Sequence, residues 1–186
     1  MTVQGALGDA EQKMRAAVSV TQEEFAAIRT GRANPKLLER ITVNYYDTQV
    51  PLIQLATTSV PEPRMLVIQP FDRTAMAAME RAILASDLGL TPTNDGNVIR
   101  LAFPPLTEER RRDLTKVAHQ RGEEGRVAVR NVRRHAKEAL ERMQRDHEIS
   151  EDDLRRAERE LQRLTDQYVA EIDDLLGHKE KELMEV

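Results

Sequence analysis

Basic side chains are concentrated in one segment of the chain, where their types and spacing suit the binding of phosphate groups. The stretch 107–147 contains no proline, which predicts one long helix. At roughly 100° per residue, the basic side chains of this helix fall within an arc of about 140°. They form what we call the basic stripe: Arg111, Arg112, Lys116, His119, Arg126, Arg130, Arg133, Arg134 and Lys137. A guanidinium group matches the geometry of phosphate oxygens, so we expect a polyanion as the partner.

The alternative for any arginine-rich helix is a solvated face whose charges are neutralised by carboxylates one helical turn away. The densest part of the stripe has no Asp or Glu between Gly125 and Lys137, so we expect no local neutralisation there and favour a functional contact. The chain has only three Tyr, three Phe and no Trp, which argues against a stacking platform for single strands. We therefore predict phosphate and groove contacts with folded RNA.

Other kinds of chemistry find little support in the sequence. The four histidines do not have metal-ligand spacing, and there is no phosphate-binding loop, nucleophile elbow or HExxH motif. The acidic pairs Asp152-Asp153 and Asp173-Asp174 are better explained as helix-start or solvated residues than as a catalytic dyad. We predict that the chain is not an enzyme and has no catalytic residues, metal site or cofactor.

The charge of the chain is unevenly distributed. The formal net charge of −4 is the sum of −1 over residues 1–106, +4 over 107–147 and −7 over 148–186. The acidic segment discourages indiscriminate polyanion binding and leaves the stripe available for a specific site. The absence of cysteine, of a signal-peptide pattern in residues 1–10 and of a membrane-spanning run predicts a cytoplasmic protein without a membrane partner.

Three long helices are expected around this stripe. Apolar residues from Met14 to Ile28 step by three and four, which predicts a first helix over about residues 9–30. Thr107 begins the second helix, and Ser150, followed by three acidic residues, begins the third. Two glycines, Gly122 and Gly125, lie within the second helix and indicate either close helix packing or a bend.

The middle of the chain has a different texture. Residues 41–46, 64–69 and 98–103 are predicted strands, with a short amphipathic helix around residues 76–84. The fold class is therefore α+β: an antiparallel three-helix bundle, residues 1–31 with 105–186, and an inserted small β/α/β domain, residues 32–104. The two connecting segments are a predicted hinge, which comprises Gly31, Arg32, Ala33, Asn34, Pro35, Phe103, Pro104, Pro105 and Leu106.

Four stretches together resemble a known family. They are Ile28-Arg29-Thr30-Gly31-Arg32-Ala33, Pro105-Leu106-Thr107-Glu108-Glu109-Arg110-Arg111, Val127-Ala128-Val129-Arg130-Asn131-Val132-Arg133-Arg134 and Ile149-Ser150-Glu151-Asp152-Asp153. In this combination the chain resembles the bacterial ribosome recycling factors over essentially its whole length. The resemblance implies an L-shaped molecule with the bundle as its long arm and a flexible corner.

The resemblance also implies a function. A member of this family binds the ribosome after termination and, with elongation factor G and GTP, parts the subunits so that messenger RNA and deacylated tRNA can leave. By this resemblance, the bundle would be held on large-subunit ribosomal RNA by the matching residues Arg111, Arg130 and Arg133. From the basic stripe we add three further candidate RNA-binding residues: Lys116, Arg126 and Arg134. We expect a monomer, with elongation factor G as the GTPase partner. A coiled-coil adaptor and a small hydrolase are the alternatives.

Overall fold

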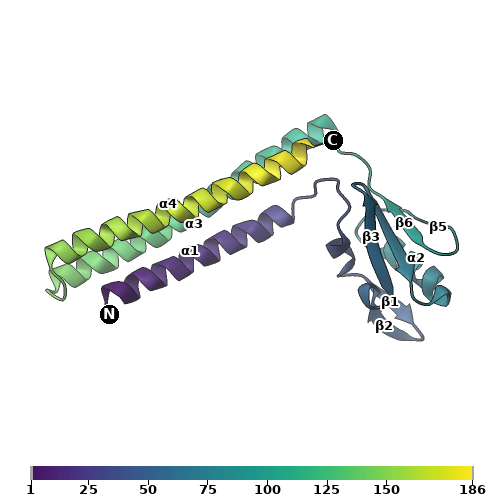
Figure 1. Cartoon of the computed structure of the whole chain (residues 1–186), viewed down its shortest axis with the longest axis horizontal. Coiled ribbons are helices and arrows are strands. Elements are labelled where there is room, and N and C mark those ends of the chain that lie inside the picture. Colours follow the sequence, from purple (N-terminus) through teal and green to yellow (C-terminus); the bar gives the residue numbers. More distant parts are fainter. Residues whose placement is uncertain (1, 186) are drawn as a thin grey trace. The chain divides into compact units, whose positions relative to one another are not determined.

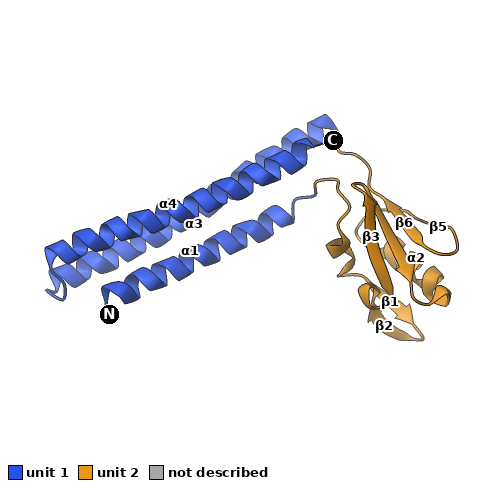
Figure 2. Cartoon of the chain, in the orientation of Figure 1, with its two compact units in different colours: residues 1–29, 107–186 blue, residues 30–106 orange. Residues whose placement is uncertain are grey.

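The computed structural model describes residues 2–185, and the chain divides into two compact units. One unit is formed by residues 1–29 together with 107–186, and the other by residues 30–106. Figure 2 colours the two units separately. The predicted α+β class, with a bundle of long helices and a separate small sheet domain, is confirmed.

Three helices form the first unit: α1 (Val3–Ala26), α3 (Glu108–Arg145) and α4 (Glu151–Met184). In Figure 1 they run side by side along their lengths. Each begins at a hydroxyl residue whose side chain accepts a hydrogen bond from a backbone N–H of the first turn: Thr2, Thr107 and Ser150. At Ser150 the cap is reciprocal, because the Asp153 carboxylate accepts from the Ser150 backbone N–H.

The predicted limits of the first helix, about residues 9–30, were wrong at both ends. Thr2 starts the helix earlier, and the buried positions Ala6 and Ala10 continue the apolar spacing towards the N-terminus. Alanine adds little to a hydrophobic pattern, so sequence periodicity did not show this extension. The helix ends at Ala26, and Gly31 adopts a φ of +75° just beyond it.

The bundle core lies along the line where the three helices meet. Its buried residues include Met14 of α1, Val129 and Leu140 of α3, and Leu161 and Ile172 of α4. Contacts of this kind bury apolar area that a single amphipathic helix would leave in water.

One polar cross-link joins α1 to α4 inside this unit. The Tyr168 hydroxyl donates to Glu11 Oε1 and accepts from Arg15 Nε, both over 2.8 Å. Burial raises the pKa of Tyr168, while the hydrogen bond from its hydroxyl lowers the pKa of Glu11. All three polar groups are thereby satisfied at the edge of the core.

The two glycines of α3 provide close helix packing, one of the two alternatives that the sequence left open. A Cβ at Gly125 would lie 2.4 Å from Thr21 Oγ1 on α1 and 3.2 Å from Ile172 Cδ1 on α4. A Cβ at Gly122 would lie 3.2 Å from Leu176 Cδ2. The absence of these side chains lets α1 and α4 approach α3, and both glycines are buried.

The second unit contains a four-stranded antiparallel sheet in the order β3-β4-β6-β5 and a separate hairpin of β1 and β2. The strands are β1 (Thr42–Tyr45), β2 (Thr48–Pro51), β3 (Ala56–Glu62), β4 (Met65–Pro70), β5 (Pro92–Asn94) and β6 (Ile99–Ala102). Helix α2 (Met76–Ala85) packs against β1, and short 3-10 turns occupy Pro35–Leu38, Leu52–Gln54 and Arg73–Ala75. The core of this unit includes Leu66, Ile68, Met79, Ile83 and Ile99.

The three predicted strands correspond to β1, β4 and β6, and the predicted short helix is α2. Strands β2, β3 and β5 were missed. β3 is an edge strand whose residues are exposed beyond Thr58 and include Pro61, so it lacks the alternating apolar pattern. β5 has only three residues, which is too short for a periodic signal.

The segments predicted to form a hinge, residues 31–35 and 103–106, lie in the second unit. A Cβ at Gly31 would lie 3.2 Å from Leu106 Cγ, so these segments run next to each other. The Ala33 and Phe103 N–H groups donate to the carbonyls of Pro63 and Arg64. Asn34 caps the turn that begins at Pro35.

Candidate nucleic-acid interface

Helix α3 presents the basic stripe beside its buried face. Leu114, Ala118 and Val129 pack into the bundle, and this fixes which way the rest of the helix faces. The stripe then lies on the flank between the buried face and open solvent, with α4 alongside part of it. Seven of its nine residues separate into two edges according to what they contact, while Arg111 belongs to neither edge and Arg112 is paired with Glu108 Oε1 over 2.6 Å.

The first edge, which we call the inner edge, comprises His119, Arg126, Arg133 and Lys137, and each of these residues contacts α4. Arg126 Nε donates to Asp173 Oδ1 over 2.7 Å, and its Nη1 donates to Glu123 Oε2 over 2.8 Å. The Asp173 carboxylate raises the pKa of Arg126, whose side chain is only 20% exposed. His119 Nε2 lies 2.5 Å from Glu180 Oε1.

The contacts of Arg133 and Lys137 neutralise less charge than those of Arg126. Arg133 Nη1 donates to the amide oxygen of Gln162 over 3.1 Å, so its charge has no anionic partner among residues 2–185. Lys137 Nζ lies 3.7 Å from Glu141 and 3.9 Å from Glu158, beyond ordinary hydrogen-bond distance.

The prediction that the densest part of the stripe escapes neutralisation was wrong for Arg130, which pairs with Glu123, and for Arg126. Glu123 lies three residues before Arg126 on the same helix, just outside the carboxylate-free run. Asp173 is 47 residues away in sequence and reaches Arg126 from α4. The first partner was visible from helical spacing; the second depends on how two helices are aligned.

The second edge, which we call the outer edge, comprises Lys116, Arg130 and Arg134. Within the described part of the chain, the side chains of Lys116 and Arg134 make no hydrogen bond or ion pair, and both residues are exposed. Arg130 is 53% exposed and has one ion pair, 3.5 Å from its Nη1 to Glu123 Oε1. At about 1.5 Å per residue, the outer edge spans roughly 27 Å of helix. It offers cations along one line to an extended polyanion.

Arg111 stands apart from both edges, in the first turn of α3. Its side chain is half-buried, and its Nε is shielded from solvent without a hydrogen-bond partner among residues 2–185. It also has no ion pair there, so its charge is uncompensated. Of the six residues assigned to RNA binding from the sequence, only Arg126 is held by two carboxylates.

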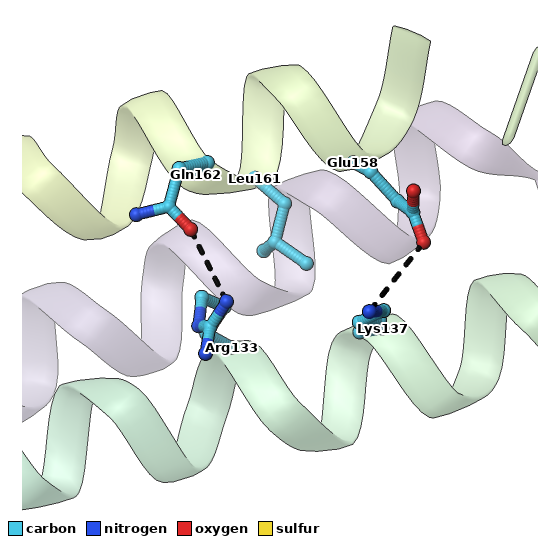
Figure 3. Close-up of a pocket in the computed structure, with 5 residues that line it drawn as sticks. All are labelled: Arg133, Lys137, Glu158, Leu161 and Gln162. Atoms are coloured by element: carbon cyan, nitrogen blue, oxygen red, sulfur yellow. Dashed lines mark hydrogen bonds and ion pairs between the residues drawn. The ribbon is translucent and has the colours of Figure 1, made fainter. Parts of the chain in front are cut away.

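A hollow of about 170 Å³ opens between α3 and α4. Figure 3 shows its five lining residues: Arg133 and Lys137 from α3, and Glu158, Leu161 and Gln162 from α4. A second hollow shares Glu158 and Gln162 and is also lined by Arg155 and Arg159. Glu158 and Gln162 were not predicted from the sequence, because nothing in the pattern of α4 indicates which of its polar residues face α3.

Metal binding finds no support within residues 2–185. No group of three or more His, Asp or Glu side chains there could hold a metal ion. None of the helices in this range is long and apolar enough to cross a membrane.

Comparison with known proteins gives one consistent result. The family model of ribosome recycling factor matches residues 21–184. Ribosome-recycling factors of Acidothermus cellulolyticus and Mycobacterium marinum are 59% and 57% identical to the chain; the former alignment covers 96% of each sequence, and the latter 97% of this chain and 98% of the relative.

Solved structures agree with these relatives. The solution structure of a ribosome recycling factor has a TM-score of 0.77 and 48% identity, covering 100% of this chain and 99% of its own. A model of the T. thermophilus ribosome recycling factor, bound with E. coli elongation factor G to the E. coli post-termination complex, has a TM-score of 0.65. It is 44% identical, and the match covers the whole of both chains.

Proposed function

Because the chain belongs to the ribosome recycling factor family, we propose that it splits the ribosome after translation termination, in company with elongation factor G and GTP. Such splitting releases messenger RNA and deacylated tRNA. The chain is a non-enzymatic translation factor. We place its action in the cytoplasm, as a monomer and without a cofactor.

The observation that carries this proposal for α3 is the outer edge of exposed cations. Lys116, Arg130 and Arg134 face solvent along one line, as phosphates of large-subunit ribosomal RNA require. Arg133 and Arg111 add charges that no carboxylate of residues 2–185 neutralises. Arg126 contributes differently: it holds α3 to α4 through Asp173 and thereby positions the neighbouring cations.

The driving step is assigned to the partner. The chain lacks a phosphate-binding loop, so nucleotide hydrolysis must come from elongation factor G. The T. thermophilus factor has been placed together with elongation factor G on a post-termination complex, which supports the same pairing here. Residues 31–35 and 103–106 lie at the two ends of the second unit, next to its boundaries with the first, and we assign them the rotation that transmits force.

Ribosome co-sedimentation at several salt concentrations tests the binding step, and light scattering tests splitting. Wild-type protein should bind ribosomes alone but split them only when elongation factor G and GTP are present. The purified chain should not hydrolyse GTP. Splitting without elongation factor G, or no association with ribosomes at low salt, would contradict the proposal.

Gly31→Ala tests the connecting segments separately. Gly31 has a φ of +75°, and the added Cβ would lie 3.2 Å from Leu106 Cγ. The substitution therefore strains the connection while leaving the outer edge intact. We expect ribosome binding to be retained and the splitting rate to fall. Gly96→Ala is the matched control, since Gly96 also has positive φ but open space around it.

A further inference from the structure

The hollow in Figure 3 combines polar side chains with an apolar wall. Arg133 and Lys137 line it from α3, and Glu158 and Gln162 line it from α4. Leu161 lies between the Arg133–Gln162 contact and the Lys137–Glu158 contact. Leu161 is only 2% exposed, so the wall that it contributes belongs to the bundle core. A ligand entering here would meet polar groups from two helices and one apolar surface.

The size of the hollow limits what can enter. Pockets for whole small molecules are typically about 300–1,000 Å³. At about 170 Å³, this hollow accommodates one planar group that projects from a larger ligand. Such a group on a nucleic acid is an unstacked base, and sequence-specific RNA recognition is directed at bases of this kind.

Two of the polar side chains are already fixed. Gln162 accepts from Arg133 Nη1 over 3.1 Å and donates to Asp166 Oδ1 over 2.8 Å. This chain of hydrogen bonds orients the Arg133 guanidinium, whose plane can stack on a base.

The other two side chains are held only by long ion pairs, Lys137 with both Glu158 and Glu141, which a ligand can replace. Lys137 Nζ and Glu158 Oε1 are 3.9 Å apart, beyond ordinary hydrogen-bond distance, and neither oxygen of Glu158 accepts a hydrogen bond within residues 2–185. The ammonium group can only donate and the carboxylate can only accept. The hollow thus presents one donor beside a pair of acceptors.

Guanine is the base whose edge complements this arrangement. Its N1–H and N2–H₂ groups are adjacent donors that match two carboxylate oxygens, and O6 beside them is an acceptor for an ammonium group. Adenine and cytosine place a ring acceptor next to their amino group, and uracil has one N–H between two carbonyls. Each of these would set an acceptor against a carboxylate oxygen.

We propose that this hollow, which we call the base pocket, binds one unpaired guanine of ribosomal RNA through Glu158 and Lys137. The inference rests on the proposed function, because it requires the basic stripe to lie on RNA. Arg159, which lines the adjoining hollow, supplies positive charge for the phosphates that flank the base, whereas Arg155 beside it is paired with Glu151 over 2.7 Å. Lys116, Arg130 and Arg134 provide affinity in this scheme, and Glu158 provides base specificity.

Kethoxal footprinting on isolated large ribosomal subunits tests the proposal, because this reagent modifies unpaired guanines at N1 and N2. The subunits are brought to the same occupancy with wild-type or Glu158→Gln protein, as measured by co-sedimentation. We expect the wild type to protect at least one guanine, and Glu158→Gln to restore the reactivity of that guanine to the level of free subunits. Lys137→Met should restore part of it.

Glu171→Gln is the matched control: Glu171 lies on the same helix, is exposed and has no hydrogen bond or ion pair in the described structure. Its footprint should equal that of the wild type, and thermal unfolding should show that all variants fold. If no protein binds the subunits, the proposed function fails. If the wild type binds but protects no guanine, or if the protection survives in Glu158→Gln, the base pocket is refuted while the proposed function stands.

Discussion

The inner and outer edges of α3 have the same kinds of side chain but different surroundings. Arg126 and Arg134 are eight residues apart on one helix, yet Arg126 is held by Asp173 and Glu123, while Arg134 has no partner among residues 2–185. The difference comes from the direction in which each side chain leaves the helix relative to α4. Position around the helix axis therefore separates an arginine that links α3 to α4 from one that stays exposed to solvent.

The largest effect should come from emptying the outer edge. Replacing Lys116, Arg130 and Arg134 together by Ala should weaken ribosome binding about 100-fold, because three charge-assisted contacts of about 1 kcal/mol each are lost. The plot of log affinity against log salt should become shallower by about 2–3, and the Tm should not change. Co-sedimentation at several salt concentrations measures both quantities. Wild-type affinity and slope in the triple variant would remove the outer edge from the mechanism.

The packed side of α3 should respond in stability. Gly125→Ala places a Cβ 2.4 Å from Thr21 Oγ1, and we expect it to lower the free energy of unfolding by about 1–3 kcal/mol despite the better helix propensity of alanine. Urea unfolding measures this change. Adding Thr21→Ala should recover much of the loss, since it removes the obstructing atoms.

Gly177→Ala is the control for that substitution. Gly177 lies within α4 and has nothing within 4 Å of its would-be Cβ, so the substitution should stabilise the protein, by up to about 1 kcal/mol. Equal effects at Gly125 and Gly177 would mean that the approach of α1 to α3 is not as close as described.

Arg126→Ala distinguishes the two edges directly. Loss of the contacts to Asp173 and Glu123 should lower the free energy of unfolding by about 1 kcal/mol, while the salt slope of ribosome binding changes little. Arg134→Ala should show the opposite pattern. A double-mutant cycle with Asp173→Ala isolates the pairwise contribution. A reduced salt slope without loss of stability would assign Arg126 to the RNA.

The smallest effect is expected when a carboxylate of α4 is neutralised. Asp173→Asn leaves Arg126 with only Glu123 as an anionic partner and makes the inner edge more positive. Binding to unrelated folded RNA at low salt should tighten a few-fold, and the salt slope should steepen by up to about one. Fluorescence anisotropy with tRNA measures this change. Unaltered binding would show that the acidic residues of α4 do not restrain the stripe.

The sequence by itself determined the elements with strong local signals. Apolar spacing located the three long helices, hydroxyl caps located the starts of α3 and α4, and strand-like residue patterns located β1, β4 and β6, half of the strands. The stripe was also local, because its residues follow helical spacing on one element. Strands β2, β3 and β5 were missed because short or exposed strands acquire their structure from pairing with neighbours rather than from their own pattern.

Only the tertiary structure decided which stripe residues are paired with α4. The alignment of α3 with α4 brings Asp173 to Arg126 and Gln162 to Arg133, and it places Glu158 near Lys137. The approach of α1 likewise settled the meaning of Gly125, through the position of Thr21. These relations depend on the rotation and register of separate helices, which many distant apolar contacts fix jointly. A charge pattern along one helix carries no record of them.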